Sequence, residues 1–218
     1  MSLRNTQEVV IWNAVTPQAV TSSTDATPIV VTKASHGYST DDLVMINGHT
    51  TNIAANGIYK ITVLSSSTFS LQDYNTGDNI AGSGGGAGSS GVVVLAPKIL
   101  SAADYRDIIL SVETSGSANF TAKVASSMGK LKSDSTAISG DTPNFGATQS
   151  KSNPYTFVQI INLDTAAAVN GATGITTAGT DLHNAYEVNT NGSEYLTLVL
   201  TAWSAGVITV KAQLLTNQ

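Results

Sequence analysis

Cysteine is absent from this chain of 218 residues. Without thiols there is no disulfide framework, no thiolate zinc site and no cysteine nucleophile. Charged residues are also scarce, at 11% of the chain against about 25% in average soluble domains. The ten basic residues form no runs and the net charge is -5. We therefore expect no nucleic-acid partner, because such proteins track phosphates with clustered Lys and Arg.

Long apolar runs are missing as well. No run approaches the about 20 residues that cross a bilayer, and residues 1–15 lack a basic stretch followed by an apolar one. We therefore expect no membrane partner, and a protein that is made in the cytoplasm and is soluble there.

What the chain has instead is hydroxyl and amide side chains, with 28 Thr, 25 Ser, 19 Gly and 16 Asn. Ser and Asn compete for backbone hydrogen bonds and so disfavour helix interiors, whereas Thr suits strands and Asn and Gly suit turns. This composition predicts an all-β protein with little helix.

Short apolar runs bounded by turn residues fill the first part of the chain, and they predict strands at residues 28–31, 43–46, 58–64 and 68–71. Asn47-Gly48 and Asn56-Gly57 supply turn residues that tolerate positive φ. The pattern indicates a small antiparallel unit. A Gly-rich segment, residues 75–91, follows it as a loop or flexible connection.

Longer strands are predicted after this segment, at residues 91–95, 105–113 and 119–125. Alternation in the last thirty residues predicts a hairpin of two strands, 196–202 and 208–214, joined by the turn Ser204-Ala205-Gly206 and buried on one face. Residues 155–163 are apolar on both faces, which fits either a central strand or an interface between protomers.

A resemblance to a known family rests on four motifs that occur in order along residues 31–73. They are Ala34-Ser35-His36-Gly37, Thr40-Asp41-Asp42-Leu43-Val44, Asn56-Gly57-Ile58-Tyr59 and Thr68-Phe69-Ser70-Leu71. This segment resembles the FCCH-like small β-barrel of ubiquitin-activating enzymes, which recurs in bacteriophage virion proteins. It departs from the family where Thr-Gly-Asp is usual and Thr40-Asp41-Asp42 stands instead. The resemblance implies a structural module of a phage particle, without ubiquitin chemistry.

Residues 141–214 are similar, in turn, to β-sandwich segments of phage virion proteins. Together these features predict an all-β fold with a small antiparallel β-barrel inserted in, or preceding, a jelly-roll-like β-sandwich. The expected divisions are an N-terminal arm at 1–24, the FCCH-like barrel with its Gly-rich loop at 25–95 and the sandwich at 96–218. A strand at residues 8–13 is a candidate to pair with the sandwich.

Catalytic and metal-binding patterns are weak throughout. The three His show no zinc spacing, and His36 is interpreted as a turn residue whose ring bonds to the backbone. Asp73, Asn75 and Asp78 fail the EF-hand spacing and are interpreted as a solvated turn, while Asp104 and Asp107 flank Arg106 as a surface charge cluster. No Gly-x-Ser-x-Gly elbow or phosphate loop occurs. We predict no enzyme activity, no cofactor and no metal.

Aromatic residues are the remaining candidates for contacts. Trp203 and Trp12, with Tyr195 and Phe157, could lie at an interface or stack on a glycan. By alternation, Trp203 is expected on the face opposite Leu198 and Leu200.

The sequence therefore favours a non-enzymatic virion structural protein, either a capsid decoration or head fibre or a tail-associated component. Its sandwich would bind other virion proteins while the small barrel projects, and the resemblance suggests a homo-oligomer, with a trimer preferred. The alternative is a tail or baseplate module that binds a host glycan.

Overall fold

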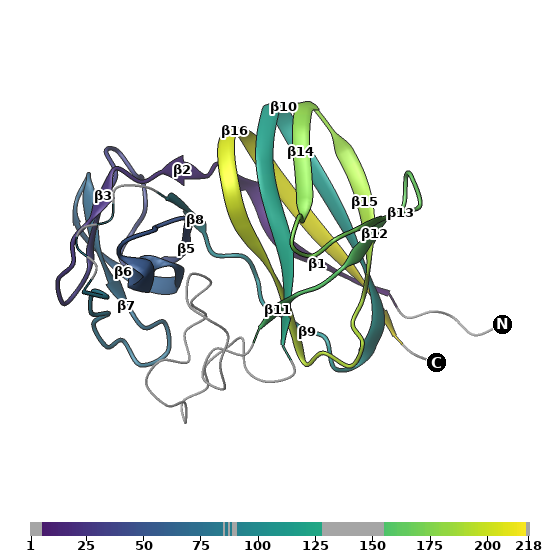
Figure 1. Cartoon of the computed structure of the whole chain (residues 1–218), viewed down its shortest axis with the longest axis horizontal. Helices are drawn as coiled ribbons and strands as arrows, with labels where there is room; N and C mark the ends of the chain where they lie inside the picture. The colour runs from purple at the N-terminus through teal and green to yellow at the C-terminus, as the bar shows by residue number, and fades with distance from the viewer. Residues whose placement is uncertain (1–5, 85, 87, 89–90, 128–154, 217–218) are drawn as a thin grey trace.

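The computed structural model describes residues 6–84, 86, 88, 91–127 and 155–216, which form two antiparallel sheets (Figure 1). The only helix among these residues is the 3-10 turn η1 (Ile53–Ala55). The all-β prediction is therefore confirmed.

The smaller sheet contains seven strands from the first half of the chain. In spatial order they are β2 (Gln18–Ala19), β8 (Val92–Leu95), β5 (Leu43–Asn47), β6 (Gly57–Ser65), β7 (Thr68–Gln72), β4 (Val30–Thr32) and β3 (Ser22–Ser23). Each of the four apolar runs predicted in this region contains a strand. Ile61, Phe69 and Leu71 are fully buried and form part of a core of its own.

This smaller sheet departs from the expected barrel in one respect, because the described residues do not close it. Its edge strands β2 and β3 are not paired with each other but follow one another along the chain. Between them, the Val20 N–H donates to the Gly91 carbonyl and the Thr21 N–H donates to the Thr32 carbonyl. A single segment, residues 18–23, thus reaches from one edge of the sheet to the other.

The larger sheet contains nine strands. Its main order is β1 (Thr6–Val15), β16 (Tyr195–Thr216), β10 (Tyr105–Ser127), β15 (His183–Asn189), β12 (Ile160–Asn162) and β13 (Ala167–Val169). Off this path, β11 (Thr156–Phe157) and β14 (Ile175–Thr180) pair with β10, and β9 (Leu100–Ser101) pairs with β16. The strand expected at residues 8–13 is β1, which pairs antiparallel with the C-terminal half of β16.

The C-terminal hairpin prediction was wrong, because β16 continues through the expected turn as one strand of 22 residues. It pairs along its length with β10, which also joins two predicted strands into one. Both strands bend where the ladder becomes irregular, near Gly116 (φ 72°) and Gly206 (φ 92°). Bulges and glycines let a strand turn a corner in this way without ending.

As a result the larger sheet folds over on itself into a sandwich, with β10 and β16 arching over at the top of Figure 1. Ile108, Leu110 and Val112 from one half of β10 share one buried cluster with Phe120 and Val124 from the other half. The alternating apolar residues of these strands therefore do form a buried face, as expected. That face packs against the other half of the folded sheet and not within a hairpin.

Residues 155–163 form no single central strand. Their first part, β11, pairs with the end of β10, whereas β12 pairs with β15 and β13. The chain crosses from one half of the folded sheet to the other at this point, so the strand must break. Ile161 and Leu163 are consequently exposed, at 40% and 43%.

Candidate functional site

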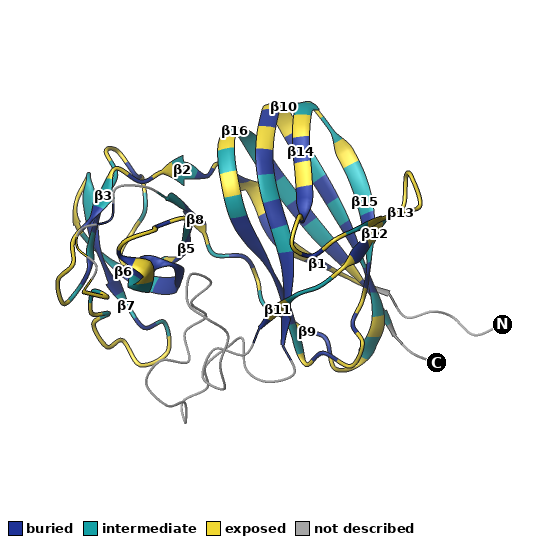
Figure 2. Ribbon diagram, in the orientation of Figure 1, coloured by how far each residue is buried: buried dark blue, intermediate teal, exposed yellow. Residues whose placement is uncertain are grey.

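The joint between the two sheets buries β16 on both faces, so the expectation of one buried face was wrong here. Leu198 points into the sandwich, and its neighbours Thr197 and Val199 are also 0% exposed. Met45, Ile58 and Val94 of the smaller sheet belong to the same buried cluster as Val199. Figure 2 shows the lower half of β16 as buried, facing the smaller sheet. The smaller sheet therefore keeps its own core and also contributes residues to the core of the larger sheet, which is the shared core of the joint.

Two hydrogen bonds between described residues cross this joint. The Asn47 side-chain amide donates to the Leu200 carbonyl at 3.0 Å, and the Trp12 indole N–H donates to the Leu95 carbonyl, also at 3.0 Å. Removing one partner of a buried hydrogen bond lowers the stability of the protein, because the other partner is left unpaired. They hold the smaller sheet in one orientation.

Trp12 is 2% exposed, so it offers no ring face to a glycan or to another protomer. Its place in the sequence gave no sign of this, because its hydrogen-bond partner Leu95 lies 83 positions further along the chain. Trp12 is an internal contact of the joint.

Trp203 does not lie on the outer face that alternation predicted. Its cross-strand partner is Phe120, whereas Leu200 pairs with Ala122, so β16 holds one extra residue in the short stretch between them. A bulge of one residue moves every later side chain to the other face. Trp203 is half-buried against the core, and its indole N–H donates to the Gly206 carbonyl at 3.0 Å.

Tyr195 and Phe157 lie on the strands on either side of the end of β10, where they pair with Ser127 and Ala125. Both are half-buried and pack against the core. Phe157 also meets the Tyr155 ring edge-on, with centroids 5.4 Å apart, and the Lys123 ammonium lies 5.0 Å from its centroid. The four predicted aromatic contacts thus do not form one exposed platform.

The motif residues of the smaller sheet make internal contacts. His36 is buried, its Nε2–H donates to the Ser65 carbonyl at 2.9 Å, and its Nδ1 accepts from the Tyr38 N–H at 3.0 Å. The prediction that this ring bonds to the backbone is confirmed. Phe69 packs edge-on against the imidazole at 5.2 Å. The motif builds structure rather than an open catalytic centre.

Asn56 continues this pattern. Its side chain accepts from the His49 N–H at 2.9 Å and donates to the His49 carbonyl at 2.8 Å. The His49 ring is buried beside the Gly88 backbone, and neither ring nitrogen has a hydrogen-bond partner among the described residues. Burial therefore lowers the pKa of His49.

Catalytic and metal-ligating groups are sparse in the described part of the chain. No group of three or more His, Cys, Asp or Glu residues there is placed to hold a metal ion. Asp73 caps its own turn by accepting from the N–H groups of Asn75 and Thr76. Ser111 Oγ lies 3.0 Å from His183 Nε2 on an exposed strand pair, but Glu113 approaches the serine rather than the other ring nitrogen. A base held by a third group, as nucleophilic catalysis requires, is not assembled there.

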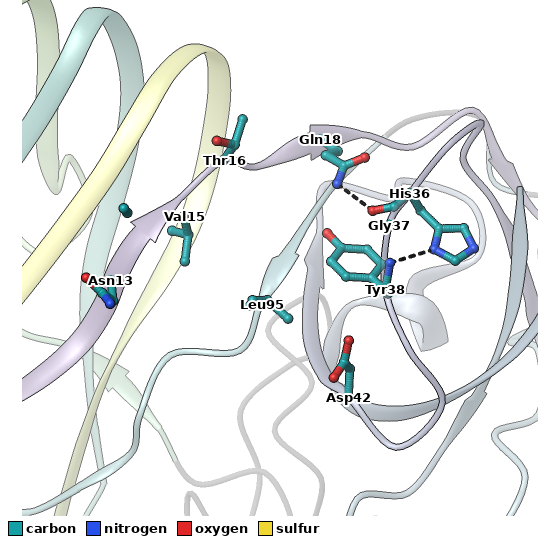
Figure 3. A pocket seen from close by; sticks show the side chains of 10 residues that line it. Asn13, Val15, Thr16, Gln18, His36, Gly37, Tyr38, Asp42 and Leu95 are labelled. Carbon is teal, nitrogen blue, oxygen red and sulfur yellow. Dashed lines mark hydrogen bonds between the residues drawn. The ribbon is translucent and has the colours of Figure 1, made fainter. Parts of the chain in front are cut away.

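A pocket of about 270 Å³ opens beside the joint (Figure 3). Asn13 and Thr16 line it from the end of β1 and the linker that follows, and Tyr38 and Asp42 line it from the loop between β4 and β5. Tyr38 is half-buried, and burial, with the Asp42 charge as a second cause, raises the pKa of its hydroxyl. No motif in the sequence marks this pocket, because its lining comes from segments far apart in the chain.

The chain matches no family model, and a search of curated proteins finds no related sequence. In the described part of the chain, no helix is long and apolar enough to cross a membrane.

Proposed function

We propose that this chain is a non-enzymatic structural protein of a bacteriophage particle, a capsid decoration or head fibre or a tail-associated component. The observation that carries the proposal is the use of the FCCH-like motif residues as internal structure. His36, Asn56 and Phe69 all hold the smaller sheet together, as a structural module requires.

The shared core at the joint supports the same proposal. Met45, Ile58 and Val94 pack into the core of the sandwich, so the smaller sheet is carried in a fixed orientation. A sandwich that binds the particle would therefore project the smaller sheet rigidly. Repetition of that contact over a symmetric particle would make weak individual contacts sufficient.

The proposal includes a homo-oligomer, preferably a trimer, by analogy with the family that the sequence resembles. Light scattering of the purified protein tests this part. A mass of three chains is expected, and a monomer at every concentration would contradict it.

Quantitative mass spectrometry of purified virions tests the function itself. A copy number comparable to that of the major capsid protein would indicate a decoration lattice, and a small number matching tail symmetry would indicate a tail part. Absence from the virion would contradict the proposal.

A further inference from the structure

The pocket beside the joint has features that point to a bound ligand. It lies where two units meet, which is a common place for small-molecule sites. Its volume of about 270 Å³ falls just under the range of about 300–1,000 Å³ typical of ligand pockets, which limits the occupant to a compact molecule such as one sugar ring.

Backbone strain occurs in the pocket lining itself. Ala14, which lines the pocket, has a φ of 49°. Residues other than glycine rarely adopt this conformation, which costs about 1–2 kcal/mol. Such outliers cluster at binding sites, where the surrounding structure holds them for a purpose. The Ala14 N–H is fixed by a hydrogen bond to Thr209 Oγ1 at 3.0 Å.

The lining chemistry selects the class of ligand. Asp42 is the one carboxylate among the described lining residues, which include no Lys or Arg, so an anion is disfavoured. Its Oδ2 already accepts from the Ser39 N–H at 2.8 Å. Asn13 and Thr16, which are both exposed, add an amide and a hydroxyl, and the side chains of Gln18, His36 and Tyr38 also line the pocket. Leu95, which is 43% exposed, adds an apolar surface at the rim.

From this combination we infer that the pocket binds one ring of a neutral sugar. Its hydroxyls would donate to the Asp42 carboxylate and the Asn13 carbonyl oxygen, and its apolar face would rest on Leu95. Figure 3 shows Asp42 and Asn13 on opposite sides of the pocket, as such a bridged ligand needs. This site is distinct from the aromatic contacts expected from the sequence, and the inference does not depend on the virion proposal.

Ligand-observed NMR with the full chain tests the inference, with glucose, galactose, mannose and N-acetylglucosamine as probes. We expect at least one of them to bind with a Kd of about 10 mM or tighter. D42N should weaken that binding about tenfold, because it removes the charge from a hydrogen bond. The matched control is D41N, which removes the same charge from an exposed residue that pairs with Lys60 outside the pocket.

N13A provides a second variant at an exposed position, where folding should be unaffected, and it should also weaken binding. Binding by none of the four sugars, or equal binding by D42N and D41N, would overturn the inference. Preferential binding of the amine spermidine over every sugar would overturn the assigned ligand class as well. A melting temperature close to that of the wild type confirms that each variant is folded.

Discussion

The two sheets reach their cores by different routes. In the smaller sheet β5, β6 and β7 follow one another and pair as neighbours, so each contact closes a short loop. In the larger sheet β10 pairs with β16, and the paired residues lie between 68 (Ser127 and Tyr195) and 111 (Tyr105 and Thr216) positions apart in the chain. Local sequence patterns are therefore enough to predict the central strands of the smaller sheet. The larger sheet depends on strand partners that are distant in the sequence, which a local pattern cannot identify.

The largest expected effect comes from breaking the joint. V199D places a carboxylate in the shared core, where Val199 is 0% exposed, and should cost about 3–5 kcal/mol because the charge has no partner. Urea unfolding measures this change. A202D, at an exposed position of the same strand, is the control and should cost less than about 1 kcal/mol. Equal losses in the two variants would show that the joint contributes no special stability.

A second prediction concerns the bend in the larger sheet. In G206A the new Cβ would lie 2.6 Å from the Cα and Cβ of Ala118, whereas in G116A it would meet nothing within 4 Å. Both substitutions place alanine at positive φ. G206A should therefore cost about 3 kcal/mol and G116A about 1 kcal/mol, compared by thermal unfolding. A smaller loss in G206A than in G116A would contradict the packing at the bend.

The difference between short-range and long-range strand pairing also explains which parts of the fold could be predicted from the sequence. The strands around Ile61 and Phe69 were predictable because alternation and turn residues act within a few positions. The continuity of β16 through Gly206 was not, because a glycine between two apolar runs is compatible with both a tight turn and a bend. Trp203 was placed on the wrong face since one bulge reverses alternation. The pocket at Asp42 exists only once distant segments meet.

A third prediction concerns the smaller sheet, whose stability should depend on pH because of the buried imidazole of His49. Its pKa is lowered in the folded protein, so the unfolded chain binds a proton first as the pH falls. Stability should be full above about pH 6.5, the pKa of the unfolded chain, and should fall towards the lowered folded pKa. The slope reaches at most about 1.4 kcal/mol per pH unit. Urea unfolding between pH 7 and pH 5 measures it.

The matching variant is H49L, which removes the titrating group from the same position. The difference in stability between H49L and the wild type should change over this pH range. A constant difference would show that His49 does not contribute to the acid sensitivity of the smaller sheet.

The smallest effects distinguish the two tryptophans. W203F removes a hydrogen bond to Gly206 at a half-buried position and should cost about 1 kcal/mol. W12F removes the bond to Leu95 at the joint, where the ring is 2% exposed, and should cost more. Thermal unfolding ranks the two losses, and the reverse order would contradict the assignment of Trp12 to the joint.

The central structural claim is that Met45, Ile58 and Val94 anchor the smaller sheet in the core of the larger one, so that the two sheets form one rigid body. Native-state hydrogen exchange tests it most directly, with amides of β5 and β8 compared with those of Leu198 and Leu200 in β16. We expect the slowest amides of both sheets to open with the same free energy, because the shared core makes them one cooperative unit. Opening of the smaller sheet at a clearly lower free energy, with β16 still protected, would contradict the claim.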